Sequence, residues 1–101
     1  MSNTIKAKLK NSTSDLKEAG DVYIFEGAGD SGYYMQFVCP CGNCNGHDSI
    51  PISMDINFAN KSNHRWHWNG SYHKPSLKPS ILRMSGCHWH GYLTEGEFRE
   101  C

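Results

Sequence analysis

Two short stretches decide how this chain is expected to fold: Cys39-Pro40-Cys41-Gly42-Asn43-Cys44, with His47 three residues further on, and the later Cys87-His88-Trp89-His90. Thiolates and imidazoles are the ligands of tetrahedral zinc sites, and a segment bent by proline and glycine can direct several of them at one ion. A zinc ion held by both stretches would cross-link parts of a small chain that buries little apolar surface unaided. The sequence therefore predicts a structural Zn²⁺ site.

The candidate ligands outnumber the four that such a site needs. Cys41 and Cys44 have the Cys-x-x-Cys spacing, and Cys39 precedes them across a proline. Cys87 and His88 are adjacent, so a regular strand would point them to opposite faces unless a bulge intervenes. The predicted metal ligands are Cys39, Cys41, Cys44, Cys87 and His88, with His47 and His90 as alternatives.

Composition narrows the class of protein. The 101 residues include ten glycines, and ten Lys plus Arg balance ten Asp plus Glu, so the net charge is zero. No chain-wide basic field would attract nucleic acid. No apolar run reaches the length of a membrane span and no secretory signal follows the first residues, so we expect a cytoplasmic protein with reduced thiols. Five cysteines, an odd number, favour metal binding over a disulfide framework.

Short β-branched and aromatic runs between turn residues predict an all-β fold with at most one short helical turn, a small zinc-stabilised, zinc-ribbon-like domain. We expect residues 1–14 to form a flexible N-terminal arm or an edge strand, and residues 15–101 a single zinc-binding β domain. Pro51 indicates an edge position for its strand. The Lys-Pro-Ser repeat of residues 74–80 predicts an extended connector. The expected strands are 22–26, 33–38, 49–54, 65–68, 81–84 and 87–94, with a tail after them.

No catalytic residue is predicted. A zinc deaminase combines His-x-Glu with Pro-Cys-x-x-Cys, and here no glutamate follows a histidine at that spacing. We therefore favour a protein-binding module. The alternatives are a nucleic-acid-binding zinc module and a zinc-dependent hydrolase or deaminase-like enzyme. A binding surface is expected at Trp66, Trp68, Lys74 and Lys78.

Three motifs occur in an order that resembles a family of small phage and prophage zinc-binding proteins of unknown function. They are Trp66-His67-Trp68-Asn69-Gly70, Lys74-Pro75-Ser76-Leu77-Lys78-Pro79-Ser80-Ile81-Leu82 and Cys87-His88-Trp89. The resemblance covers about residues 22–95. Members often carry the label "ammonia monooxygenase", which does not suit this chain, because that enzyme is a membrane complex and no segment here could span a membrane.

The resemblance implies a phage or prophage origin, zinc held by the first-stretch cysteines with Cys87 and His88, and no known catalytic activity. Relatives also occur beside bacterial ubiquitin-like conjugation genes, which implies a role in conflict between host and phage. We therefore expect a protein that binds and modulates a host macromolecule, most simply a host or host-defence protein, in the host cell cytoplasm. The chain departs from the family pattern at its additional first-stretch cysteine and at His90, where an apolar residue is more usual.

Overall fold

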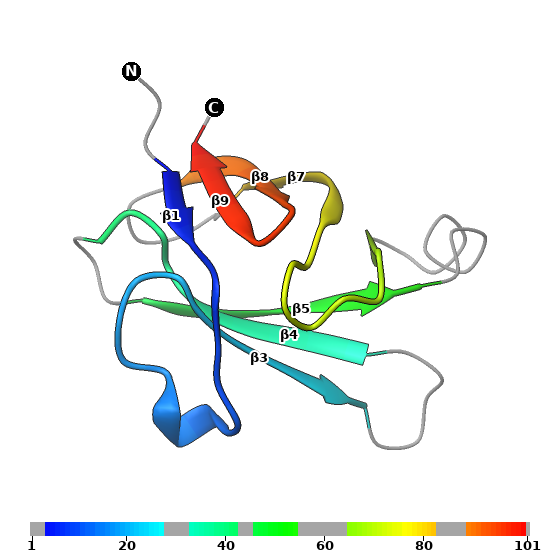
Figure 1. The fold of residues 1–101 in the computed structure, drawn as a ribbon, viewed down its shortest axis with the longest axis horizontal. Coiled ribbons are helices and arrows are strands. Elements are labelled where there is room, and N and C mark those ends of the chain that lie inside the picture. Colours follow the sequence, from blue (N-terminus) through cyan, green and yellow to red (C-terminus); the bar gives the residue numbers. More distant parts are fainter. Residues whose placement is uncertain (1–3, 28–32, 43–45, 55–64, 83–88, 101) are drawn as a thin grey trace.

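The computed structural model describes residues 4–27, 33–42, 46–54, 65–82 and 89–100. The prediction of an all-β chain is confirmed, since these residues form strands and one short 3-10 helix, Thr13–Asp15 (Figure 1). None of the described helical segments is long and apolar enough to cross a membrane. The strands are β1 (Thr4–Lys6), β2 (Lys8–Leu9), β3 (Asp21–Glu26), β4 (Tyr33–Val38), β5 (His47–Ser53), β6 (Trp66–Trp68), β7 (Leu77–Leu82), β8 (His90–Thr94) and β9 (Glu97–Glu100).

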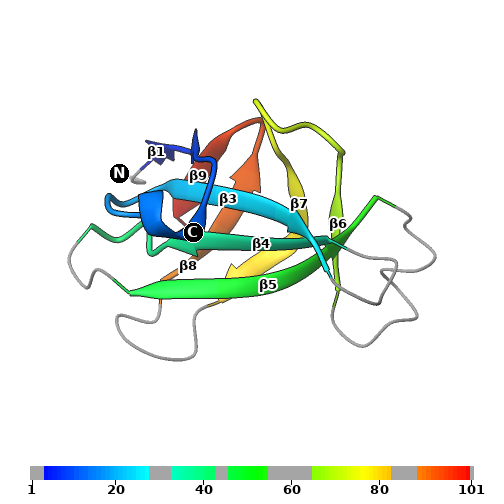
Figure 2. The ribbon, with the colours of Figure 1, turned by 90° about the horizontal axis from the view of Figure 1, so that it is seen from below.

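All strands belong to one sheet in the order β1-β9-β8-β7-β6-β5-β4-β3-β2. β1 and β2 lie at its two ends, yet only Ala7 separates them in the sequence. The N-terminal segment therefore pairs with β9 on one side and with β3 on the other. This pairing nearly closes the sheet into a barrel, with β3 to β5 opposite β7 to β9 (Figure 2). Thr4–Lys6 and Lys8–Leu9, expected as a flexible arm or an edge strand, are edge strands.

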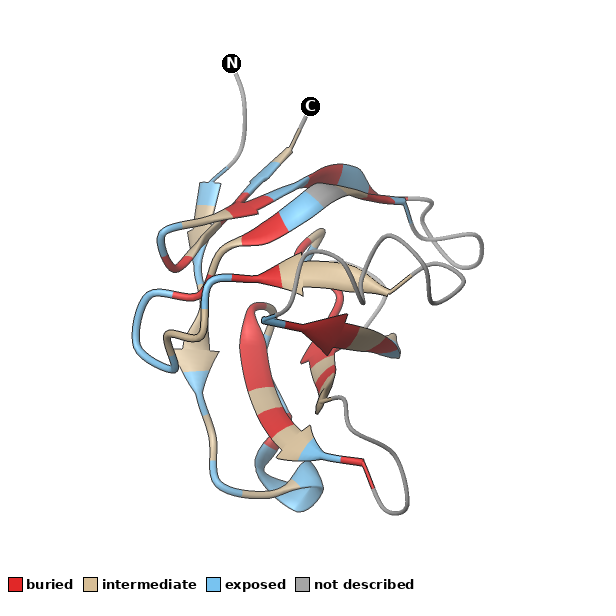
Figure 3. Cartoon of the chain, turned by 90° about the vertical axis from the view of Figure 1, so that its right-hand side faces the viewer, coloured by how far each residue is buried: buried red, intermediate tan, exposed pale blue. Residues whose placement is uncertain are grey.

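Alternation along the strands places one set of side chains inside the barrel, as the burial colours of Figure 3 show. Phe37 of β4 and Phe98 of β9 are almost fully buried, and their ring centroids lie 5.5 Å apart. Trp89 meets Phe98 edge to face, with centroids 6.0 Å apart. These rings join strands from opposite sides of the barrel, so they form the centre of the core.

Three details differ from the sequence-based expectations. Pro51 is not on an edge strand, because β5 lies between β4 and β6. It is tolerated there since β6 pairs only with Ile52 and Ser53, and no N–H is needed at position 51 on that side. The second half of the Lys-Pro-Ser repeat is not a connector but part of β7. The expected tail after residue 97 is β9, held in place by buried Phe98.

Candidate functional site

The first cysteine stretch forms the connection between β4 and β5. The Cys39 N–H donates a hydrogen bond to the Gly46 carbonyl (2.7 Å), which extends the β4–β5 pairing by one step. The Gly42 N–H lies 3.5 Å from the Cys39 carbonyl, and Gly42 has a φ of 77°, a conformation that favours glycine. Cys39 is 1% exposed within the core, and Cys41 packs against that core.

The structure describes only some of the predicted zinc ligands. Cys44, Cys87 and His88 lie outside them. His47 and His90 are exposed, at the starts of β5 and β8. Among the residues that the structure describes, no three His, Cys, Asp or Glu side chains are grouped so as to hold a metal ion. The zinc site and its ligand set stay a prediction.

A serine and a histidine meet on the outward face of the β7–β8 pair. Ser80 Oγ and His90 Nε2 lie 3.1 Å apart in a hydrogen bond. In the tautomer that carries its proton on Nδ1, the His90 ring accepts this bond and the serine hydroxyl donates it. The pair is open to solvent, since His90 is exposed and Ser80 half-buried. A hydroxyl within hydrogen-bond reach of an imidazole is the basic arrangement of a base-activated nucleophile.

The position of Ser80 depends on an irregularity in β7. Leu77 pairs with Leu93 and Ile81 with Gly91, so four steps along β7 match two along β8. The additional residues form a bulge, a feature that re-aims side chains and is frequent beside active sites. The Trp66 indole N–H donates to the Ser80 carbonyl at 3.2 Å, which fixes the serine backbone from the β6 side. The hydrogen bonds with Trp66 and His90 therefore hold Ser80 at the bulge.

His90 lies in the sequence between Trp89, which directly precedes β8, and Gly91 of β8. Trp89 is 4% exposed, and Gly91 lies directly against its ring. A Cβ at position 91 would come within 2.6 Å of Trp89 Cη2 and would also meet the Arg99 carbonyl oxygen. The absence of a side chain at Gly91 therefore lets Trp89 enter the core beside His90.

A cavity of about 370 Å³ opens on the same side of the sheet as Ser80. It includes Lys78, the outward residue of β7 that precedes Ser80 by two positions. Some polar groups of the cavity wall form hydrogen bonds within the fold. The Ser76 hydroxyl accepts the Glu95 N–H at 2.7 Å, and Asn69 Oδ1 accepts the Ser76 N–H at 3.0 Å. The lining residues are His67, Asn69, Ser76, Lys78, Thr94 and Glu95.

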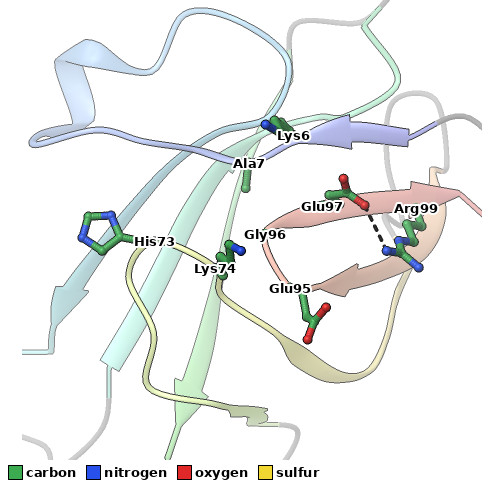
Figure 4. A pocket seen from close by; sticks show the side chains of 8 residues that line it. All are labelled: Lys6, Ala7, His73, Lys74, Glu95, Gly96, Glu97 and Arg99. Atoms are coloured by element: carbon green, nitrogen blue, oxygen red, sulfur yellow. Dashed lines mark hydrogen bonds and ion pairs between the residues drawn. The ribbon is translucent and has the colours of Figure 1, made fainter.

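A second cavity, of about 430 Å³, lies beside the β8–β9 turn (Figure 4), and Glu95 lines both cavities. Its walls come from the N-terminal segment (Lys6, Ala7), the β6–β7 connection (His73, Lys74) and the hairpin of β8 and β9. Arg99 Nη2 lies 3.0 Å from Glu97 Oε1, so one of its cations is already paired. Neither Ser80 nor His90 lines it, which separates this larger cavity from the serine–histidine pair.

Ser80 is not among the residues predicted from the sequence, and His90 is predicted only as an alternative metal ligand. The available signal was alternation, which places Ser80 and His90 on the outward face of consecutive strands. Of the expected binding surface, Lys74 and Lys78 are exposed and Trp66 is half-buried. Trp68 differs from that expectation, because it is 1% exposed and contributes to the core.

The chain was compared with protein families, curated proteins and solved structures. A family model described as "Bacterial ubiquitination-like system serine protease (BubE)" matches residues 8–101. No curated protein and no solved structure matches the chain.

Proposed function

Because the chain belongs to the family of the bacterial ubiquitination-like system serine protease (BubE), we propose that it is a serine peptidase in which Ser80 is the nucleophile and His90 the general base. The observation that carries this proposal is the 3.1 Å hydrogen bond between Ser80 Oγ and His90 Nε2. A serine peptidase needs a base that reaches its hydroxyl, and this distance lies within the range of such pairs.

The pair would act in two stages. His90 Nε2 takes the hydroxyl proton as Ser80 Oγ attacks the scissile carbonyl carbon, and a C–O bond forms. The imidazolium returns the proton to the leaving nitrogen, the C–N bond breaks, and the acyl group stays on Ser80 as an ester. His90 then deprotonates a water molecule, which hydrolyses the ester and restores the hydroxyl.

The family description also bears on the substrate. It names a bacterial ubiquitination-like system, and we infer that the scissile amide bond belongs to a protein of such a system. Ser80 and His90 lie on an outward sheet face, where the end or an extended loop of another protein can approach. The expectation of a protein partner is consistent with this proposal, whereas a phage origin and a host-defence partner stay predictions.

An active-site-directed probe tests the proposal without knowledge of the substrate. An alkyl fluorophosphonate should label the protein, and mass spectrometry should locate the adduct at Ser80. Ser80→Ala should abolish labelling, whereas Ser49→Ala, which changes an exposed serine of β5, should leave it unchanged. Labelling at another residue, or no labelling of the folded wild-type protein, would refute Ser80 as the nucleophile.

A pair of histidine variants tests the base. His90→Gln should reduce the labelling rate by about 10²–10⁴-fold, the usual contribution of a general base. His88→Gln is the informative comparison, because the family pattern quoted above has its histidine at position 88. Loss of reactivity in His88→Gln at wild-type zinc content and melting temperature, with His90→Gln still fully reactive, would transfer the role of the base to His88.

We also propose that a structural Zn²⁺ joins the two cysteine-containing stretches. β5 runs parallel to β6, and β6 runs antiparallel to β7, so the start of β5 and the end of β7 point to the same end of the barrel. The first stretch precedes β5 and the second follows β7. This arrangement supports a shared site, with thiolate and imidazole ligands of the kind that structural zinc uses.

A further inference from the structure

The surface around Ser80 and His90 carries large apolar side chains. Leu82 is 51% exposed and Tyr92 48% exposed. Leu82 pairs directly with His90 across the β7–β8 ladder, and Tyr92 is the next outward residue of β8 after His90. Single exposed apolar residues are ordinary, but two that flank a reactive pair on one face mark a contact surface.

The 370 Å³ cavity lies on the opposite side of Ser80 from Leu82. Lys78, Ser80 and Leu82 are successive outward residues of β7, and Lys78 lines the cavity. Its volume is near the lower end of the range for ligand sites, about 300–1,000 Å³. The cavity therefore has room for one large side chain with some backbone, but not for a folded element.

The spacing along β7 matches that of an extended peptide. Outward side chains of a strand recur about every 6–7 Å, and alternate side chains of an extended substrate have the same repeat. A peptide that lies over Ser80 along β7 would thus place one side chain over Leu82 and Tyr92 and another at the mouth of the cavity near Lys78.

We propose that the outward face of β7 and β8 selects an extended substrate segment with bulky apolar side chains within two residues of the scissile bond. Leu82 and Tyr92 contact one of these side chains, and the cavity beside Lys78 and Thr94 accepts another. The proposal rests on the assignment of Ser80 as the nucleophile and adds the class of segment that this nucleophile receives.

Peptidyl phosphonates, which bind in a fixed register and phosphonylate the serine of serine peptidases as their leaving group departs, test this selection. Two probes of equal length, one with leucine and one with glycine at the positions flanking the phosphonate, are compared by their rates of Ser80 labelling. We expect the leucine probe to react roughly tenfold faster, the scale of selectivity that apolar contacts provide. Leu82→Ser and Tyr92→Ser should each reduce this ratio, and Thr94→Trp, which fills the cavity, should reduce it as well.

Leu9→Ser is the matched control, because Leu9 is also exposed (39%) but lies on β2, far along the sheet order from β7. It should leave the ratio unchanged. The ratio is taken within each variant, so a general change in the reactivity of Ser80 affects both peptidyl probes and cancels. Leu9→Ser should also leave the rate with the small fluorophosphonate unchanged. Equal rates for the two peptidyl probes, or ratios in Leu82→Ser and Tyr92→Ser equal to that of wild type, would overturn the proposed selection. Failure of the fluorophosphonate to label wild-type Ser80 would instead remove the nucleophile and this proposal with it.

Discussion

At the scale of single residues, a buried carboxylate organises the start of the barrel. Asp21 is 1% exposed, and its Oδ2 accepts the N–H groups of Lys17 and Glu18 at 3.0 and 2.9 Å. Burial disfavours the charged form, but the two backbone donors and the charges of Lys10 and Lys8 outweigh it, so the pKa of Asp21 lies below its usual value. The ionised side chain therefore stabilises the turn before β3.

This pKa gives a prediction for acid stability. A carboxyl group whose pKa is lower in the folded state stabilises the fold above its unfolded pKa, about 3.9, and the benefit disappears as the pH falls through the lower folded pKa. Asp21→Asn should lower the free energy of unfolding by about 2 kcal/mol at pH 7 and by less at pH 2. Thermal unfolding at both pH values measures this, and exposed Asp15 supplies the control Asp15→Asn. An equal loss at the two pH values would contradict the argument.

Gly91 carries a second prediction at this scale. Gly91→Ala places a methyl group within 2.6 Å of the Trp89 ring, and overpacking of this kind costs about 1–3 kcal/mol. The melting temperature should fall, and fluorophosphonate labelling should slow because His90 is the adjacent residue. A variant with wild-type stability would show that both the Trp89 ring and the Arg99 backbone can move aside freely.

Individual site residues were harder to predict from sequence than their surroundings. Ser80 belongs to a Lys-Pro-Ser repeat that favours a connector, and its role depends on a bulge and on the indole of Trp66, both of which are tertiary contacts. His90 stands among other candidate ligands, so its residue type alone favoured metal binding. Only the short distance between the Ser80 and His90 side chains distinguishes this pair from the other serines and histidines that the structure describes.

At the scale of elements, alternation of apolar residues correctly predicted most strands, including Tyr33–Val38 and Trp66–Trp68. The exceptions have physical causes. Pro51 lies in an interior strand because the neighbouring β6 is short. β9 pairs along Gly91 to Thr94 and buries Phe98, although its charged residues made it look like a tail.

The N-terminal strands give a prediction for an element. Removal of residues 1–7 deletes β1, leaves the outer edge of β9 unpaired and breaks the hydrogen bond from the Ala7 N–H to the Gly96 carbonyl (2.8 Å). An unpaired edge favours association between chains. We expect a lower melting temperature and a concentration-dependent increase in mass by light scattering. A truncated chain that stays monomeric with unchanged stability would show that β1 is dispensable.

At the scale of the whole molecule, we expect the predicted zinc site to contribute strongly to stability. Removal of the ion should loosen the chain, because a small core would lose the link between two distant segments. Cys44→Ser or Cys87→Ser should abolish stoichiometric zinc, whereas Cys101→Ser, outside both stretches, should not. Elemental analysis measures the zinc content, and circular dichroism follows unfolding after chelation. Full zinc content in both Cys44→Ser and Cys87→Ser would exclude a shared site.

The all-β class was predictable at this scale, but closure of the barrel was not. Periodicity reports which face of a strand is buried, and carries no information about which distant strand it meets. The pairing of β1 with β9 joins opposite ends of the described chain, so no local pattern indicates it.

That pairing also fixes when the barrel can be completed during synthesis. Thr4 leaves the ribosome long before Arg99, its partner in the sheet. Until β9 emerges, β1 has no native neighbour, and the apolar rings that meet Phe98 lack their last contact. Folding dominated by such distant contacts is slow and exposes unpaired strands. The nascent chain therefore remains open, and its dependence on chaperones should be greatest just before the last strand is released.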